Sequence, residues 1–244
     1  MPRFFLSDGG PVDGAIVLTG QQASHARALR LRPGDAVAVC DGAGTDYDCT
    51  VAELTSDRLV LIVRGCAPSA SEPRLRTSVY MAFAKSDKLE HVIQKATELG
   101  AWEIVAFPSA RCVSRPDDRS LVKKLERWQK IAASAAEQSG RGRIPTVRTV
   151  SSFAAAVTEA AACDCAALLY ENERSVTFRS RVEQGPFSTA AILTGPEGGF
   201  EPSEVEEAAA AGLAVCTLGP RILRCETAPL CALTALLFAC GELD

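Results

Sequence analysis

The stretch AAILTGPEGGFEPSEVEEAAAA at residues 190–211 contains a strand, a glycine-rich loop and a helix in succession. The apolar run at 190–194 is typical of a buried strand, and the segment at 202–211 predicts a helix. A strand that leads through a short loop into a helix is the repeating unit of proteins built on a mainly parallel sheet.

The same alternation extends outward over most of the chain. Strands are predicted at residues 78–84, 103–107, 166–170, 190–194 and 214–218, and helices at 87–99, 117–139, 153–161, 202–211 and 228–240. This pattern predicts an α/β fold with a mainly parallel sheet and helices on both faces.

The first 65 residues have a different pattern. Short β-prone stretches at 15–18, 36–40, 47–54 and 59–63 are separated by turn signals such as PGD at 33–35, which predicts a small β-barrel. An arginine-rich segment at 25–32 is expected to be a short helix or loop. Residues 66–76 are rich in Pro, Ser and Ala and are predicted to be a linker, so the chain should have two domains.

Composition excludes several classes of protein. Hydrophobic residues make up 47% and charged residues 23% of the chain, which is ordinary for a globular protein, and no apolar run reaches the roughly 18 residues of a membrane helix. The N-terminus lacks the apolar core of a secretory signal, so a cytoplasmic location is expected. Ten cysteines without a C-x-x-C pair and only two histidines, His25 and His91, predict buried, reduced thiols and no metal site.

Positive charge is concentrated in one segment although the formal net charge is −4. Residues 111–150 carry ten basic and four acidic side chains, whereas residues 151–244 carry five and thirteen. Such a segment is typical of contact with RNA phosphates, although a solvated helix face explains Lys123 and Lys124 equally well. The candidate RNA-binding residues are Arg27, Arg30, Arg32, Lys88, Arg111, Arg115, Arg119, Lys123, Lys124, Arg141 and Arg143.

Ligands of open α/β sheets bind beyond the carboxyl ends of the strands, so the loops after 190–194 and 214–218 are the expected site. The first loop contains GPEGG at 195–199, and its glycines allow close approach of the backbone to a ligand. It is not a Walker A loop, because no Gly-Lys-Ser/Thr follows, and it does not open the domain as a Rossmann loop would. The second loop reads LGPRILRCETA at 218–228 and leads directly into the last helix.

These two loops closely resemble the paired cofactor loops of the ribosomal small subunit methyltransferase E (RsmE) family, a branch of the SPOUT methyltransferases. The shared patterns are G-P-E-G-G and L-G-x-R-I-L-R-x-E-T-A. Segments 88–100, 128–132 and 137–141 also match the family's helices, so the resemblance covers nearly the whole chain. Two departures are Cys225, where the family usually has Thr, and Pro229, where a helix-forming residue is more common.

The resemblance implies an N-terminal PUA-like β-barrel at residues 1–68 and a SPOUT methyltransferase domain at residues 74–244 with a C-terminal trefoil knot. It implies a homodimer with the active site at the subunit interface. It further implies S-adenosylmethionine-dependent methylation of uridine N3 in 16S rRNA, in the decoding region of the 30S subunit. The implied cofactor-binding residues are Leu193, Thr194, Gly195, Pro196, Glu197, Gly198, Gly199, Leu218, Gly219, Arg221, Ile222, Leu223, Arg224 and Thr227.

Methylation of uracil N3 requires removal of a proton and stabilisation of the negative charge that develops on O2 or O4. Arg221 and Arg224 are the candidates for charge stabilisation. Glu226 is a candidate for accepting or orienting the proton, and a buried ion pair that only shapes the loop is an equally good interpretation of it. Cys225 is interpreted as a small buried residue more readily than as a reactive thiol.

Two other functions share part of this pattern. A SPOUT ribose 2′-O-methyltransferase would have the same fold and cofactor loops, but the Asn that usually precedes a glycine in its long-helix motif is missing from EQSGR at 137–141. An RNA-binding assembly factor without turnover is disfavoured by the intact glycines in both loops.

Overall fold

The computed structural model describes residues 1–6 and 9–243. The chain divides into two compact units. The first contains Met1–Glu72 and Ala136–Ile144, and the second contains Pro73–Ala135 and Pro145–Asp244. Each unit has its own hydrophobic core.

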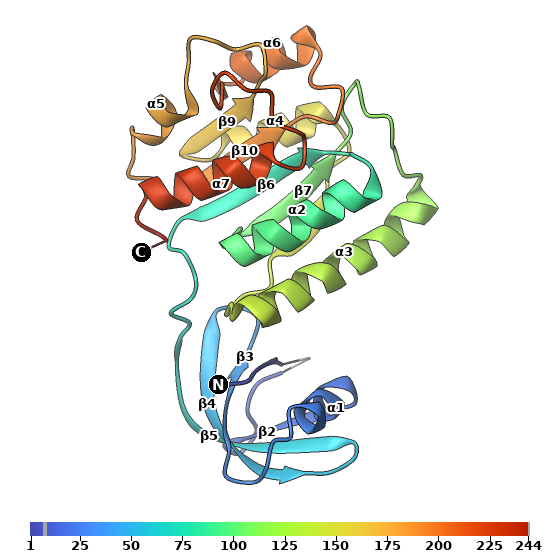
Figure 1. The fold of residues 1–244 in the computed structure, drawn as a ribbon, viewed down its shortest axis with the longest axis vertical. Helices are drawn as coiled ribbons and strands as arrows, with labels where there is room; N and C mark the ends of the chain where they lie inside the picture. Colours follow the sequence, from blue (N-terminus) through green and yellow to red (C-terminus); the bar gives the residue numbers. More distant parts are fainter. Residues whose placement is uncertain (7–8, 244) are drawn as a thin grey trace. The chain divides into compact units, whose positions relative to one another are not determined.

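The first unit is a curled sheet of five strands in the order β1-β3-β4-β5-β2 (Figure 1). Its strands are β1 (Arg3–Phe5), β2 (Ala15–Thr19), β3 (Ala36–Cys40), β4 (Thr45–Leu54) and β5 (Arg58–Pro68). Apolar side chains alternate along these strands and gather in one core. Helix α1 (Gln21–Ala28) packs on this core through Ala23 and Ala26, which are fully buried.

The segment Ala136–Ile144, which begins in the last turn of helix α3 (Asp118–Ser139), belongs to the first unit. Its main chain is hydrogen-bonded to the sheet, because the carbonyl of Gly142 accepts from Gly44 N–H (3.0 Å). The N–H of Gly142 donates to the Glu72 carboxylate (2.9 Å). Residues far apart in the sequence therefore complete one small core.

The second unit contains a six-stranded sheet in the order β11-β9-β10-β6-β7-β8, in which every neighbouring pair is parallel. Its strands are β6 (Arg76–Ala82), β7 (Glu103–Phe107), β8 (Thr146–Thr149), β9 (Cys165–Leu169), β10 (Thr189–Thr194) and β11 (Ala214–Cys216). Because the strands are parallel, the loops that follow β9, β10 and β11 emerge side by side at one edge of the sheet.

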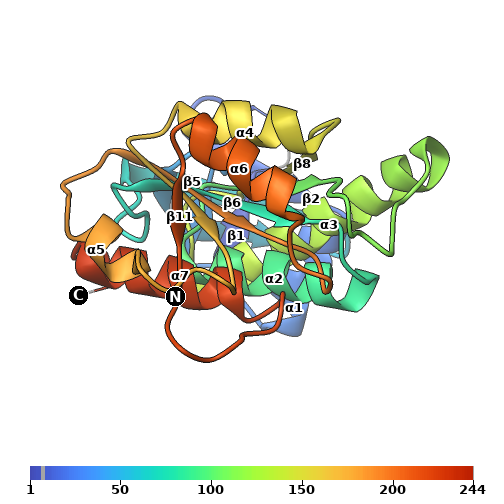
Figure 2. The ribbon, with the colours of Figure 1, turned by 90° about the horizontal axis from the view of Figure 1, so that it is seen from above.

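Helices cover both faces of this sheet (Figure 2). Helices α4 (Phe153–Ala161) and α6 (Pro202–Ala210) lie on one face, and α2 (Ser86–Leu99), α5 (Phe178–Val182) and α7 (Ala228–Ala239) lie on the other. Helix α3 lies beside α2 and forms an ion pair with it between Arg127 and Glu90 (2.7 Å). No helix in residues 1–6 and 9–243 is both long enough and apolar enough to cross a membrane.

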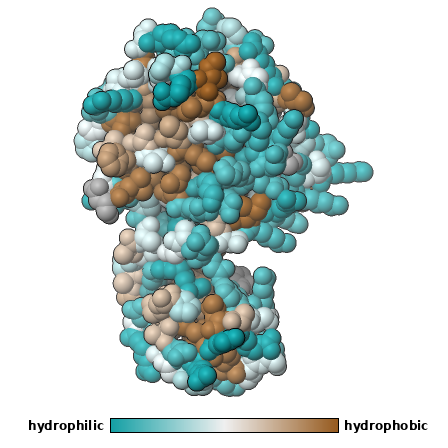
Figure 3. Space-filling model, in the orientation of Figure 1, coloured by the Kyte–Doolittle hydropathy of each residue, from teal (hydrophilic) through white to brown (hydrophobic). Residues whose placement is uncertain are grey.

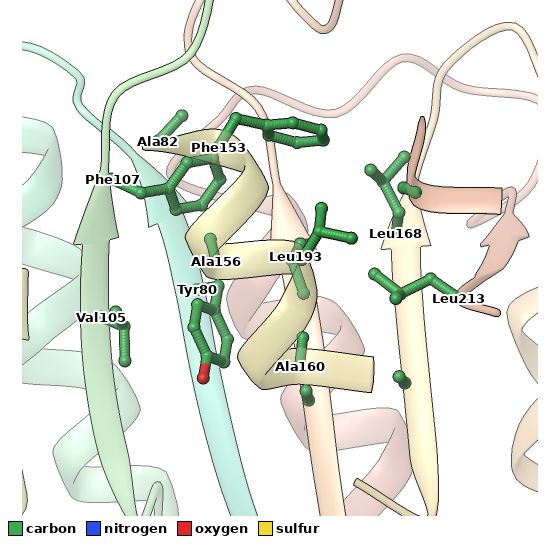
Figure 4. Packing of buried hydrophobic residues seen from close by; sticks show 14 of the residues in the cluster. Tyr80, Ala82, Val105, Phe107, Phe153, Ala156, Ala160, Leu168, Leu193 and Leu213 are labelled. Carbon is green, nitrogen blue, oxygen red and sulfur yellow. The ribbon is translucent and has the colours of Figure 1, made fainter. Parts of the chain in front are cut away.

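One core of the second unit lies between the sheet and helices α4 and α6. Phe153 packs against Phe107 and Phe200, with ring centroids 6.0 and 5.7 Å apart, and Figure 4 shows Phe107 and Phe153 together above the sheet, with Leu193 close to α4. Burial of each such side chain contributes about 1.5–3 kcal/mol. This packing fixes the position of β10, and therefore the point at which the glycine loop begins, at the carboxyl end of that strand.

The predicted fold class, a mainly parallel sheet with helices on both faces and a separate N-terminal β-structure, is confirmed. The arginine-rich segment at 25–32 is partly helical, because α1 begins earlier, at Gln21, and ends at Ala28. The predicted linker at 66–76 is too long, since β5 continues to Pro68, paired with Thr45, and β6 begins at Arg76. Sequence analysis missed β1, β8 and α5, which are too short to show a clear period.

Candidate functional site

A cavity of about 430 Å³ opens at the carboxyl ends of β9, β10 and β11, a size typical of small-molecule sites. Its walls come from three loops and from α2 and α7. The lining residues are Lys88, Leu169, Tyr170, Glu171, Thr194, Gly195, Pro196, Glu197, Gly198, Gly199, Thr217, Leu218, Gly219, Arg221, Ile222, Leu223, Arg224, Cys225 and Ala228.

The two loops that the sequence singles out meet in this cavity. Of the residues predicted to bind the cofactor, all except Leu193 and Thr227 line it. Leu193 is fully buried in the core beneath. Thr227 lies at an adjoining hollow.

The first loop, at 195–199, is a tight turn that requires glycine. Gly199 has φ of +69°, and its N–H donates to the carbonyl of Pro196 (3.0 Å). A Cβ added at Gly195 would come within 3.2 Å of the main-chain carbon of Gly199. A side chain at that position would push the two ends of the turn apart, so glycine keeps the loop closed beside the cavity.

The second loop is anchored at both ends. After β11, the Thr217 hydroxyl accepts from Gly219 N–H (3.2 Å) and donates to the carbonyl of Gly219 (3.1 Å). At the far end, the Arg224 carbonyl accepts the N–H groups of Thr227 (2.8 Å) and Ala228 (2.9 Å), which starts α7. The segment between these anchors carries Arg221 and Arg224, both with exposed side chains.

Lys88, on α2, joins the two loops. Its Nζ lies 3.4 Å from Glu197 Oε1 in the first loop and 3.4 Å from Glu226 Oε2 in the second. It also lies 3.8 Å from the Sγ of Cys225. Sequence analysis named Lys88 among the candidate RNA-binding residues, and in the structure it is the cation between two carboxylates.

The protonation of this cluster follows from its contacts. Burial alone would lower the pKa of Lys88, but the acidic groups of Cys225, Glu197 and Glu226 outweigh burial and raise it. Burial likewise opposes ionisation of the two carboxylates, yet main-chain N–H groups and Lys88 lower the pKa of both. Burial raises the pKa of Cys225 to about 12. At neutral pH the cluster therefore contains an ammonium, two carboxylates and a neutral thiol, which agrees with Cys225 as a small buried residue.

A second, more open hollow of about 630 Å³ adjoins this cluster. Glu226 lines this hollow and not the first cavity, so its pair with Lys88 lies between the two spaces. The other lining residues are His91, Thr227, Leu230, Cys231, Thr234, Ala235 and Phe238. The hollow thus has a polar end at Glu226 and an apolar wall along α7.

Sequence analysis missed the third wall of the cavity, which follows β9. Leu169, Tyr170 and Glu171 line it there, and Thr217 and Ala228 also contribute. This loop also follows the carboxyl end of a parallel strand, where ligands are expected. It lacks the glycines that mark the other two loops, so its sequence carries no comparable signal of a binding site.

The candidate RNA-binding arginines differ in their surroundings. Arg111 binds the Glu201 carboxylate through Nε (2.8 Å) and Nη2 (3.1 Å), and Arg115 donates to main-chain carbonyls. Arg141 is only 3% exposed and is bound to Glu72. Burial therefore favours a structural role for Arg141, in place of the RNA contact that its charge suggested. Arg143 is partly buried, whereas the side chains of Arg27, Arg30, Arg32 and Arg119 are exposed.

Within residues 1–6 and 9–243, no group of three or more His, Cys, Asp or Glu side chains is arranged to hold a metal ion.

The chain is similar in sequence to proteins of known name. A family model described as RNA methyltransferase domain matches residues 71–237, and one described as RNA methyltransferase PUA domain matches residues 18–64. The chain is 36% identical to ribosomal RNA small subunit methyltransferase E of Bacillus subtilis, over 90% of this chain and 88% of that protein. It is 34% identical to the protein of the same name from Mycobacterium bovis, over 95% and 90%.

Solved structures show the same similarity in three dimensions. A ribosomal RNA small subunit methyltransferase E from Neisseria gonorrhoeae, bound to S-adenosylmethionine, superposes with a TM-score of 0.87 at 30% identity, covering 98% of this chain and 97% of that one. A methyltransferase from Legionella pneumophila in complex with the same cofactor superposes with a TM-score of 0.84 at 27% identity, covering 97% of each chain.

Proposed function

The chain belongs to the ribosomal RNA small subunit methyltransferase E family, and we propose that it methylates N3 of one uridine in the decoding region of 16S rRNA. It is an rRNA methyltransferase that uses S-adenosylmethionine. The observation that carries the proposal is the cavity in which the two glycine loops meet at the carboxyl edge of the parallel sheet.

The cavity fits S-adenosylmethionine in size and in chemistry. The main chain of both glycine loops is close enough to hydrogen-bond an adenosine, and Leu169, Leu218 and Leu223 offer apolar surface for the adenine ring. Lys88, Glu197 and Cys225 lie in the same wall and offer polar groups to the methionine part. When bound there, the cofactor supplies a methyl group that its sulfonium makes electrophilic.

The arginines of the second loop are placed to stabilise the uracil anion. Loss of the N3 proton costs on the order of 3–4 kcal/mol at neutral pH if the pKa of N3 is about two to three units above neutrality. A donor aimed at the developing charge on O2 or O4 contributes several kcal/mol in a site without bulk water. Arg221 and Arg224 line the cavity with exposed side chains, so they are the catalytic residues of this proposal.

Glu226 orients the base in this mechanism. Its lowered pKa keeps the carboxylate ionised, so Glu226 accepts a hydrogen bond from N3–H, and the proton passes to solvent water before N3 takes the methyl group. It lies at the polar end of the hollow beside Lys88. The uracil is therefore expected beside Glu226, where the hollow adjoins the cavity that Arg221 and Arg224 line, with N3 directed toward the cofactor.

The RNA partner is 16S rRNA of the small subunit, recognised through its phosphates and folded shape. The exposed arginines Arg27, Arg30 and Arg32 of the first unit supply contacts to phosphates in this proposal, together with the basic segment 111–150. Arg141 is left out because it is buried. A protein that acts on the ribosome is expected in the cytoplasm.

We further propose that the protein is a homodimer and that residues 1–68 and 74–244 are its two domains, the second of which contributes the segment Ala136–Ile144 to the first compact unit. We also propose that the second domain contains a trefoil knot. The dimer is supported by α7, which exposes Phe238 (70%) and whose surroundings are apolar in Figure 3. A face of this kind is typical of a protein interface. Wild-type protein is therefore expected to sediment at about twice the 25.8 kDa monomer mass at micromolar concentration.

The Phe238→Glu variant is expected to sediment as a monomer, because it places a charge in the apolar interface. Val122→Glu, at an exposed apolar position on α3, is the matched control and should remain dimeric. A wild-type protein that sediments only near the monomer mass would contradict the dimer.

Replacement of Lys88 by methionine is expected to weaken binding of S-adenosylhomocysteine by about tenfold or more. The change keeps the length of the side chain but leaves Glu197 and Glu226 without the cation between them. Lys95→Met is the control, because Lys95 lies on the same helix and pairs with Glu98 away from the cavity. Titration calorimetry measures both affinities, and equal affinities in the two variants would remove Lys88 from the cofactor site.

The proposed reaction is tested with 30S subunits that lack this modification, purified protein and S-adenosylmethionine, followed by mass spectrometry of 16S rRNA nucleosides. We expect 3-methyluridine at one position. 2′-O-methylated nucleosides would show a ribose methyltransferase instead, and no product despite cofactor binding would show that 16S rRNA is not the substrate.

A further inference from the structure

We propose that Glu171 binds the ribose of the cofactor, with its carboxylate accepting hydrogen bonds from the 2′ and 3′ hydroxyl groups. The inference rests on the proposed function and extends it to a residue outside both glycine loops. It assigns a specificity role to the loop after β9, the third wall of the cavity.

Topology places Glu171 between the two cofactor loops. Strand β9 lies between β11 and β10 in the sheet, so the loop that follows it emerges between the loops that follow those strands. Glu171 comes two residues after the end of β9 and is partly exposed toward the cavity. A carboxylate beyond the carboxyl end of a parallel strand is the group that accepts ribose hydroxyls in many nucleotide sites.

The carboxylate of Glu171 lies directly against the glycine turn. A Cβ added at Gly199 would overlap Glu171 Oε1. Glycine at this position therefore leaves room for the carboxylate as well as for the turn. Gly212, which also has positive φ, has open space where a Cβ would be, so the close approach is a property of Gly199 and not of every turn.

Within the described part of the chain, the Glu171 carboxylate accepts no hydrogen bond. Its main-chain oxygen accepts from Arg174 Nη1, but the two carboxylate oxygens have no donor. The neighbouring carboxylates are engaged, since Glu197 pairs with Lys88 and Glu201 pairs with Arg111. An ionised carboxylate only accepts, so a ligand in the cavity can supply donors to both of its oxygens.

A neutral donor fits this position better than a cation. The guanidinium of Arg111 is near, held by Glu201 and by the carbonyl of Gly198 (3.1 Å). The hydrogen bond to Glu201 is the main cause that raises the pKa of Arg111, and the negative charge of Glu171 adds to this effect. A positive charge therefore already faces the carboxylate, which favours the paired hydroxyls of a ribose over the methionine ammonium as the donors.

The test compares four ligands by titration calorimetry: S-adenosylhomocysteine, its 2′-deoxy and 3′-deoxy analogues, and 5′-deoxy-5′-methylthioadenosine. Wild-type protein should bind each deoxy analogue about 10- to 100-fold more weakly than S-adenosylhomocysteine. Glu171→Gln should lose affinity for S-adenosylhomocysteine and for methylthioadenosine by similar factors and should discriminate little against the deoxy analogues. Glu207→Gln, on the exposed side of α6, should behave as wild type.

Two results would overturn the inference. The first is tight binding of both deoxy analogues by the wild type. The second is a loss of affinity in Glu171→Gln for S-adenosylhomocysteine but not for methylthioadenosine, which would show that the carboxylate binds the ammonium. The first result needs no variant, so the test stands even if Glu171→Gln fails to fold. Absence of any binding of S-adenosylhomocysteine to the wild type would instead refute the proposed function, and this inference with it.

Discussion

Replacement of Glu72 by alanine is expected to lower the free energy of unfolding of the first unit by about 3–5 kcal/mol. The Glu72 carboxylate accepts from Arg141 Nη2 (2.6 Å) and Nε (3.2 Å), and Arg141 is only 3% exposed. It also accepts the main-chain N–H groups of Gly142 (2.9 Å) and Arg143 (3.0 Å). Removal of the carboxylate therefore takes the counter-ion from a buried guanidinium and the acceptor from two main-chain donors.

The matched control is Glu53→Ala, which breaks the exposed pair between Glu53 and Arg58 (3.1 Å). An exposed pair contributes about 0–1 kcal/mol, so this variant should be near wild type. Urea denaturation followed by circular dichroism gives the free energies, and hydrogen exchange in β3–β5 shows whether the loss is in the first unit. If Glu72→Ala lowers the free energy of unfolding by no more than Glu53→Ala does, the buried pair does not hold the segment Ala136–Ile144 in place.

This ion pair also shows what the sequence could not predict. Arg141 is 69 positions from Glu72, and no local pattern relates them. The net charge of residues 111–150 indicated RNA contact for Arg141 as it did for Arg111 and Arg115, but burial is decided by tertiary packing and not by charge. The ion pairs of Lys88 could not be predicted from the sequence either, because its two carboxylate partners follow it by more than 100 residues.

The layers of the second unit could be predicted because buried parallel strands are continuous apolar runs. The strand at 103–107 agrees with the prediction at both ends, since EIVAF is followed by Pro108 and preceded by Gly100, Ala101 and Trp102, which follow the end of α2. β8, with the sequence TVRT, has one buried residue and an arginine in an ion pair with Glu103. Its place at the edge of the sheet gives it no apolar run to recognise.

The site could be predicted where the backbone itself has an unusual requirement. Gly195 and Gly199 are needed for a tight turn, and that need is visible in the sequence. Glu171 follows a strand as well, but an acidic residue in a loop is ordinary, and only its contact with Gly199 distinguishes it. The sequence therefore indicates where the main chain binds the ligand better than where side chains do.

Replacement of Arg224 by alanine is expected to lower kcat by about 10²- to 10³-fold, with little change in affinity for S-adenosylhomocysteine. The main chain of Arg224 is fixed by the turn that starts α7, so the variant keeps the loop and loses only the guanidinium. Without that donor, negative charge on O2 or O4 of the uracil develops with less compensation, and proton loss from N3 becomes the limiting step.

The measurement is single-turnover formation of 3-methyluridine on 30S subunits that lack the modification, at several pH values. The rate of Arg224→Ala should rise more steeply with pH than that of wild type, because higher pH supplies the anion that the arginine no longer stabilises. Arg179→Ala, at an exposed position on α5 outside the cavity, is the control and should retain the wild-type rate. A donor to the uracil anion acts on the step after binding of the substrate. If Arg224→Ala instead loses affinity for 30S subunits but keeps the wild-type rate at saturating 30S concentration, Arg224 is a phosphate contact and not a catalytic residue.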